Sequence, residues 1–311
     1  MIDMRDAFFE RLVELAKEDE RIIFLTADHG AFSLKEFEKE MPSRYINVGI
    51  SEQSMVGVAA GLAASGKIVF AYGIAPFVSL RVLEQLTLDV AAMQLPVNIV
   101  SVGAGFTYST DGPTHQGLQD LPAVLTIPKM TVLNSSDPAN TRGFVDYVVS
   151  RQQPHYIRIE KEKLDSFKHV EIEERLIDLG FSVLKKGRSK TIVVATGCMT
   201  HSVLEFFNSF NTNENDSVTV VDLFQIKPLS LDFLCYLGRY EKLITVEEGY
   251  VSGMGSAISR ALSINDIRLK EIYNFGIDED YYFSADNREV MVDFSEIKGK
   301  IMSVLGSENE K

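Results

Sequence analysis

Short runs of apolar, β-branched residues alternate along the first half of the chain with longer segments whose apolar positions recur every three or four residues. The short runs are typical of buried strands, and the longer period is typical of amphipathic helices. Strands are predicted at 22–27, 45–48, 68–72, 97–102, 130–133 and 156–159. Strands that alternate with helices predict a parallel, doubly wound sheet.

The same alternation starts again after a charged stretch, 160–175. Further strands are predicted at 191–195, 218–221, 243–246 and 267–272, each separated by a helical segment. The chain has 311 residues, which is enough for two domains of about 100–200 residues each. The fold class is therefore α/β, with two doubly wound domains, a larger one over 1–165 and a smaller one over 186–311, joined by a linker, 166–185.

Charge and cysteine content narrow the classes of function. Lys and Arg number 31 against 44 Asp and Glu, so a net charge of −13 argues against binding to a nucleic-acid backbone. Cys198 and Cys235 lack metal-ligand spacing, so no metal site is expected, and so few cysteines are typical of a reducing cytosol. The least charged stretch, 55–78, is interrupted by Lys67 and Pro76, and the N-terminus has no export pattern. We expect a cytoplasmic protein that does not bind membranes.

Residues that could carry chemistry follow the strands of the first domain. Asp28 follows the first predicted strand, Glu52 the second and Phe77 the third. The fourth is followed by a loop rich in Gly, Ser and Thr that contains Asp111 and His115 and is longer than compact domains usually use. Because ligands bind beyond the carboxyl ends of strands in open α/β sheets, these side chains are expected at one functional edge.

Each of these residues also has a purely structural interpretation. In the structural interpretation, Glu52 interacts with the positive end of a helix dipole. In the functional one, its carboxyl group lies in apolar surroundings and shares a proton with a ligand nitrogen. Asp-Gly-Pro at 111–113 is a strong turn signal, but it would also place Asp111 and His115 where both face the hydroxyls of a sugar. Phe77 would otherwise be a core residue.

Longer motifs run through both halves of the chain. In the first domain they are Tyr-Ile-Asn-Val-Gly-Ile-Ser-Glu-Gln at 45–53, Gly-Val-Ala-Ala-Gly-Leu-Ala at 57–63, Asp-Gly-Pro-Thr-His-Gln-Gly at 111–117, Pro-Lys-Met-Thr-Val-Leu at 128–133 and Ser-Asp-Pro at 136–138. In the second they are Val-Val-Asp-Leu-Phe-Gln-Ile-Lys-Pro-Leu at 220–229, Thr-Val-Glu-Glu-Gly at 245–249 and Gly-Met-Gly-Ser at 253–256. Together they resemble the transketolase and 1-deoxyxylulose-5-phosphate synthase family of thiamine-diphosphate enzymes. The resemblance implies a pyrimidine-binding domain followed by a transketolase C-terminal domain.

The resemblance also implies a missing part. Full-length members begin with a diphosphate-binding domain whose Gly-Asp-Gly motif holds magnesium and the diphosphate of the cofactor, and this chain has no Gly-Asp-Gly. A separate N-terminal transketolase-type subunit is expected to supply that site, Mg²⁺ included, and to assemble with this chain as a heterotetramer. Each half alone is expected to be inactive.

Family roles carry over to matching positions. Glu52 resembles the glutamate that bonds a nitrogen of the aminopyrimidine of thiamine diphosphate, and Phe77 resembles the aromatic residue that stacks on it. Ile50 and Asp28 are expected beside the same cofactor. Asp111 and His115 match the pair that contacts substrate hydroxyls and moves protons.

Arg158 falls where relatives have an arginine that binds substrate phosphate, a task suited to a fork of N–H donors; its alternative is a surface arginine at a strand end. Lys161 stands where the synthases have a second arginine, and Ser54 replaces a histidine that usually follows the Glu52 position. These departures leave open whether the sugar is phosphorylated, modified, nucleotide-linked or free of phosphate.

The implied function is transfer of a two-carbon ketol unit from a ketose, expected to be a phosphate, to an aldose acceptor. One alternative is the β subunit of a 2-oxo acid dehydrogenase decarboxylase, which shares the Ile-Ser-Glu-Gln element; Asp-Gly-Pro-Thr-His-Gln argues against it. A carboligase similar to deoxyxylulose-phosphate synthase is a second alternative. A non-catalytic regulatory subunit is a third, and the presence of Glu52, Asp111 and His115 together argues against it.

Overall fold

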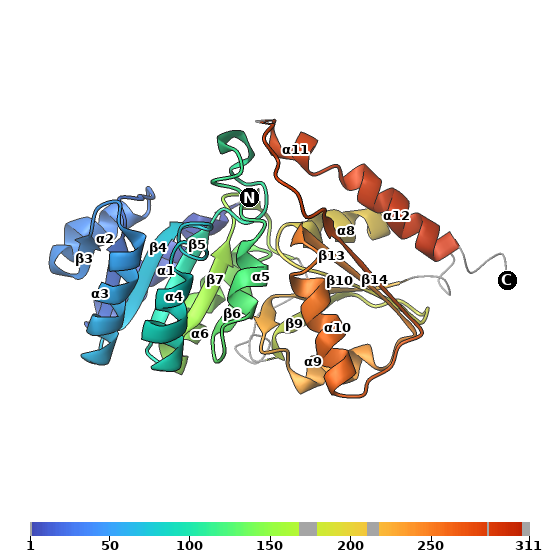
Figure 1. Cartoon of the computed structure of the whole chain (residues 1–311), viewed down its shortest axis with the longest axis horizontal. Coiled ribbons are helices and arrows are strands. Elements are labelled where there is room, and N and C mark those ends of the chain that lie inside the picture. The colour runs from blue at the N-terminus through green and yellow to red at the C-terminus, as the bar shows by residue number, and fades with distance from the viewer. Residues whose placement is uncertain (1, 168–178, 210–217, 285, 307–311) are drawn as a thin grey trace.

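The computed structural model describes residues 2–167, 179–209, 218–284 and 286–306, which build two α/β units (Figure 1). Most of the predicted linker lies outside these residues, as does the segment 211–216, whose polar sequence predicts a turn. Within them, every helix is too short or too polar to cross a membrane.

The first unit is centred on a seven-stranded sheet with the strand order β12-β6-β7-β5-β4-β2-β3 in the described residues. Its strands are β2 (Ile22–Thr26), β3 (Tyr45–Asn47), β4 (Ile68–Ile74), β5 (Val97–Val102), β6 (Thr131–Asn134), β7 (His155–Ile159) and β12 (Gln225–Lys227). The six strands from the first half of the chain are mutually parallel, as predicted. A two-stranded pair, β1 (Ile2–Asp3) with β8 (Lys163–Leu164), ties the start of this unit to its end.

Helices cover both faces of this sheet (Figure 1). One face carries α1 (Met4–Glu18), α2 (Leu34–Glu40) and α6 (Pro138–Arg151); the other carries α3 (Glu52–Ala64), α4 (Leu83–Gln85) with its π-helical continuation η2 (Leu86–Ala92), and α5 (Asp120–Leu125). Two short 3₁₀ turns, η1 (Pro42–Arg44) and η3 (Ser109–Asp111), lie in the connections. Local sequence explains where the long helices start: the Asp3 carboxylate caps α1, and Asp137 forms a capping box before Pro138 of α6.

The second unit has a five-stranded sheet with the order β14-β13-β10-β11-β9 in the described residues. Its strands are β9 (Phe181–Lys185), β10 (Thr191–Ala195), β11 (Thr219–Leu223), β13 (Lys242–Tyr250) and β14 (Glu271–Ile277). On one face lie α8 (Met199–Ser209) and α12 (Phe294–Gly306), and on the other α9 (Leu231–Leu237) and α10 (Met254–Ile264). The short helix α11 (Arg288–Met291) lies beside η3 of the first unit.

Three strands differ from the expected pattern. The strand predicted at 267–272 is β14 and begins at Glu271, because its register follows β13, while Ile267 packs against the core before the strand starts. Strand β9, in the last part of the predicted linker, was not foreseen and pairs antiparallel with β11. Strand β12 was also missed; it leaves the second unit and adds an antiparallel edge to the first sheet, next to β6. Its sequence, Gln-Ile-Lys, has a single apolar residue between two polar ones, which gives no apolar run from which a strand could be predicted.

A buried carboxyl group joins the two units. Asp222 on β11 accepts hydrogen bonds from Ser136 of the first unit (2.5 Å, Oγ to Oδ2) and from Thr200 (3.2 Å, Oγ1 to Oδ1). Burial raises the pKa of Asp222 to about 7, because desolvation disfavours the charged form. Between about pH 4 and pH 7, the Asp222 carboxyl group is therefore protonated in the native state, whereas it is ionised in the unfolded chain.

We expect Asp222→Asn to flatten the pH dependence of thermal stability. The stabilisation from the protonated carboxyl is complete below the unfolded pKa and is lost as pH rises through about 7. Asparagine has the shape of the neutral acid and loses nothing over this range. The melting temperature of the variant relative to the unsubstituted chain should rise by roughly 3–8 °C between pH 5 and pH 8. Asp266→Asn, at an exposed position, is the control and should show no such trend; parallel curves for all three proteins would refute the expectation.

Candidate active site

The carboxyl edge of the first sheet gathers most of the predicted side chains. Gly49 has a φ of +77°, a conformation that glycine adopts readily, and it turns the chain from β3 into α3. This turn makes Glu52 the first residue of α3, where its side chain is 6% exposed. Its Oε2 atom accepts a 2.8 Å bond from Nη1 of Arg81, on the segment that follows β4. A buried carboxylate thus meets a single half-exposed cation.

Four side chains form a continuous row at this edge. The guanidinium of Arg81 lies over the ring of Phe77, 4.1 Å from its centroid. Phe77 in turn meets the imidazole of His115 edge-on, with ring centroids 5.0 Å apart. The row therefore runs from Glu52 through Arg81 and Phe77 to His115, and it draws on three different strand ends.

The guanidinium of Arg81 indicates what this row can hold. It is a flat group that lies on an aromatic face and donates an N–H to a buried carboxylate. An aminopyrimidine ring is flat in the same way and offers both a ring nitrogen and an amino group to such partners. Glu52 and Phe77 therefore fit the cofactor that the sequence implied, provided that Arg81 moves aside. Arg81 was missed in the sequence, although a lone cation in the apolar run 76–83 was a signal.

Loop 103–117 is closed at its base and carries His115 and Asp111. Gly105 and Gly117 exchange two backbone hydrogen bonds, of 3.0 and 2.8 Å, so the ends of the loop lie together. Asp111 ends η3 and is exposed, while His115 is half-buried and its Nδ1 lies 2.9 Å from the hydroxyl of Thr114. The base is tight, since a Cβ on Gly117 would lie 2.3 Å from the carbonyl oxygen of Gly103. The base of the loop is thus held by hydrogen bonds and close packing, and the loop carries two polar side chains, those of Asp111 and His115.

Asp28 and Ile50 lie farther out on the same edge, at the β2 and β3 end of the sheet. The Asp28 carboxylate accepts from the amide of Asn47 (3.0 Å), and the Asn47 oxygen accepts from the backbone N–H groups of Asp28 (3.1 Å) and Gly49 (2.9 Å). Ile50 is 79% exposed, only two residues before Glu52. These two residues border the row of four side chains rather than forming part of it.

Arg158 lies in a different environment from the one predicted. It is 2% exposed within β7, its Nε donates to Asp120 (2.8 Å), and its Nη2 donates to the carbonyl oxygen of Gly117 (2.6 Å). A phosphate would have to displace these partners to reach the guanidinium. As placed, Arg158 supports the base of loop 103–117 from inside the protein. The position of Arg158 along its strand could not predict this burial, because Asp120 and loop 103–117 cover the side chain.

Sequence comparisons agree with this architecture of two α/β units. The family model described as "Transketolase, pyrimidine binding domain" matches residues 1–166, and "Transketolase, C-terminal domain" matches residues 180–278. The chain belongs to the transketolase family. This confirms the resemblance seen in the motifs and the predicted fold class.

Individual relatives indicate which members of the family this chain is similar to in length and domain content. One subunit of the apulose-4-phosphate transketolase from Phocaeicola vulgatus is 31% identical, over 94% of this chain and 93% of its own length. A 6-deoxy-6-sulfo-D-fructose transketolase subunit from Clostridium sp. is 34% identical, over 84% and 81%. A solved structure described as a split-gene transketolase, inactive β4 tetramer, is 31% identical with a TM-score of 0.78 and covers 91% of each chain. This chain thus has the pyrimidine-binding and C-terminal domains and matches split-transketolase subunits over most of their length, and the dehydrogenase and carboligase alternatives are not favoured.

Proposed function

We propose that this chain transfers two-carbon ketol units between sugars only as part of a complex with thiamine diphosphate. In that complex a second, N-terminal transketolase-type subunit holds the diphosphate and Mg²⁺. The observation that carries the proposal is the buried carboxylate of Glu52, which lies next to a flat group stacked on Phe77. The site residues proposed for this chain are those of the row together with Asp111, with Asp28 and Ile50 at its border.

The residues of this chain would position groups and move protons. Thiamine diphosphate, when bound, supplies the carbon centre that accepts the ketol unit and the electrons of the broken bond. Glu52 would bind a pyrimidine nitrogen and exchange a proton with it, from a site where little water competes. Phe77 would hold the ring flat by its apolar face. His115 and Asp111 would bind substrate hydroxyls and accept or return protons as the carbon–carbon bond changes.

An anionic sugar is the substrate class that the relatives favour, since one acts on a phosphate and another on a sulfo sugar by name. Arg158 is buried against Asp120 and is poorly placed to bind either group. Lys161 is exposed, and its ammonium lies 5.8 Å from the ring centroid of Tyr108 on loop 103–117. We propose that Lys161 provides the cationic contact for the anionic end of the sugar.

The assembly proposed is a heterotetramer with self-association of this chain. A related split-gene subunit is described as an inactive β4 tetramer, which supports self-association without activity. The division into 1–165, a linker at 166–185 and 186–311 remains our proposal for the domains. On this view the partner completes the active site by facing the carboxyl edge of the first unit.

Reconstitution tests the proposal directly. The chain should show no transketolase turnover alone with thiamine diphosphate and Mg²⁺, and clear turnover when mixed with the subunit that carries Gly-Asp-Gly, because each half holds a different part of the cofactor. Several ketose phosphates and sulfo sugars serve as donors, and light scattering gives the stoichiometry. Full activity from the chain alone would contradict the split site. Release of CO₂ from pyruvate by the mixture, without ketol transfer, would revive the carboligase alternative.

A further inference from the structure

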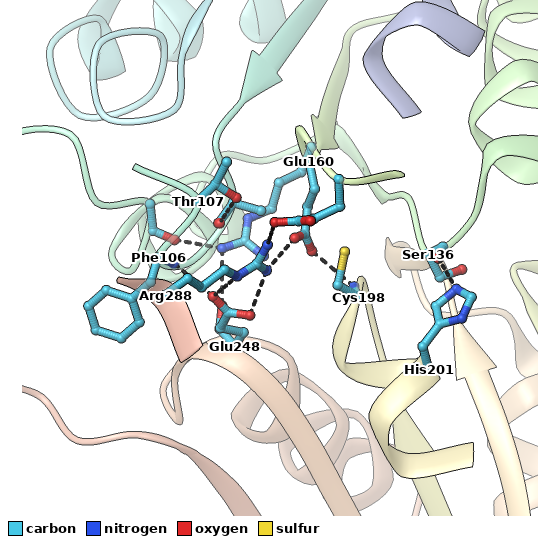
Figure 2. Close-up of polar contacts among 12 residues, drawn as sticks. Phe106, Thr107, Ser136, Glu160, Cys198, His201, Glu248 and Arg288 are labelled. Atoms are coloured by element: carbon cyan, nitrogen blue, oxygen red, sulfur yellow. Dashed lines mark hydrogen bonds and ion pairs between the residues drawn. The ribbon is translucent and has the colours of Figure 1, made fainter. Parts of the chain in front are cut away.

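A partly buried ionic cluster connects the second unit to loop 103–117 (Figure 2). Arg288, at the start of α11, donates from Nε to Oε1 of Glu248 on β13 (3.0 Å) and from Nη2 to its Oε2 (2.6 Å). The same guanidinium pairs with Glu160, directly after β7 of the first unit, and through Nη1 with Glu162 (2.7 Å). One arginine therefore spans both units by bonding three carboxylates.

The loop backbone rests directly on this cluster. Oε1 of Glu248 also accepts a 2.8 Å hydrogen bond from the backbone N–H of Phe106, which is fully buried. Gly105 has no room for a side chain, since a Cβ there would lie 2.4 Å from the same oxygen. The contact thus fixes the first arm of loop 103–117, while Arg158 holds the second arm through Gly117.

The segment that leads into α11 packs on both arms of the loop as well. The ring of Tyr282 meets Phe106 edge-on, with centroids 5.2 Å apart. Its carbonyl oxygen accepts from the side-chain amide of Gln116 (3.0 Å), the residue next to His115. The C-terminal unit therefore contacts the loop on either side of the tip that carries Asp111.

The buried carboxylates of this cluster need Arg288 as their counter-charge. Burial acts to raise the pKa of Glu160, but Arg288 and the N–H of Cys198 together hold it below its ordinary value. Glu248 is 7% exposed, and a buried carboxylate without a partner carries a large desolvation cost. Arg288 neutralises this cost and keeps the Glu248 carboxylate aligned with the loop.

We propose that Glu248 and Arg288 are positioning residues that hold loop 103–117 in the geometry that binds the sugar. Neither touches the row of Glu52, Arg81, Phe77 and His115, so they act through the loop. The kinetic part of this inference rests on the proposed function, whereas the structural part does not. It gives the C-terminal unit a defined task at a site formed by the first unit.

Glu248→Ala in the complete complex tests this inference. Phe106 then loses its acceptor, while Arg288 keeps Glu160 and Glu162. Loop misplacement should raise KM for the ketose or lower kcat by roughly 10- to 100-fold. Affinity for thiamine diphosphate, titrated by calorimetry, should stay within about twofold because Glu52 and Phe77 lie off the loop. Glu248→Gln keeps an oxygen for Phe106 and should recover part of the loss, and exposed Glu241→Ala is the matched control.

Amide hydrogen exchange separates this inference from the proposed function. Peptides that cover 103–117 should exchange at least about tenfold faster in the Glu248→Ala variant, whether or not the complex turns over. Arg288→Lys keeps the charge but loses the fork, and it should give the same effect in milder form; it carries the test if Glu248→Ala fails to fold. Unchanged exchange in the loop together with unchanged kinetic constants would overturn the inference, as would an equal loss of cofactor affinity.

Discussion

Replacing Glu52 by glutamine is expected to lower kcat of the reconstituted complex by roughly 10²- to 10⁴-fold. Glutamine has the same size and can still accept the hydrogen bond that Arg81 donates to Oε2 over 2.8 Å. It cannot take up a proton, however, so the exchange with the pyrimidine nitrogen is lost. Steady-state turnover at saturating ketose and cofactor measures the effect, and the fold should be retained because the side chain keeps its shape.

Two measurements make the Glu52 result specific. The exposed Glu38 on α2 undergoes the same chemical change in Glu38→Gln, which should leave kcat within about twofold. Thermal unfolding of Glu52→Gln should match that of the unsubstituted chain to within a few degrees. Activity above half of the normal value in the Glu52→Gln complex would favour the non-catalytic, regulatory interpretation of this chain.

Replacing His115 by glutamine should reduce kcat by roughly 10²- to 10³-fold. The imidazole is half-buried, its ring packs edge-on against Phe77, and its Nδ1 lies 2.9 Å from the Thr114 hydroxyl. That bond orients the ring, so that the other nitrogen is available to a substrate hydroxyl. Glutamine preserves hydrogen bonding but cannot exchange a proton near neutral pH, so kcat should fall more than KM rises.

A second histidine at the same edge provides the control for His115. His29 follows β2, and its ring lies 5.0 Å from that of Tyr72. Burial lowers the pKa of His29 to about 4, so it stays neutral at working pH. His29→Gln should therefore change kcat less than about threefold. Equal losses in the two variants would show that histidine packing at this edge, rather than proton transfer, explains the result.

Charge within the first unit also shapes the site. Arg81 pairs with Glu52 and covers the face of Phe77 that a pyrimidine ring would need. Its side chain is 44% exposed, so it can swing into solvent at low cost. The arginine therefore compensates the charge of the buried carboxylate, and under the proposed function it would move aside when the pyrimidine ring binds.

Local sequence determined much of this protein. Alternating apolar periods specified nearly all strands of the first sheet, because each strand is a short buried run between turn signals. Gly49 and the residues after it placed Glu52 at a helix start, and Asp-Gly-Pro marked the loop with Asp111 and His115. These features depend on neighbours within a few positions, so they are visible in one sequence.

Contacts between distant residues were decided only by the tertiary structure. Glu248 bonds Phe106 across 142 positions, and Arg288 bonds Glu160 across 128. Arg158 was expected to face substrate, yet Asp120 and Gly117 bury it. Strand β12 joined the first sheet because β6 offered an unpaired edge. Contacts of this kind depend on how packed elements lie against one another in space. No local period or motif in the chain encodes which carboxylate will pair with a given arginine.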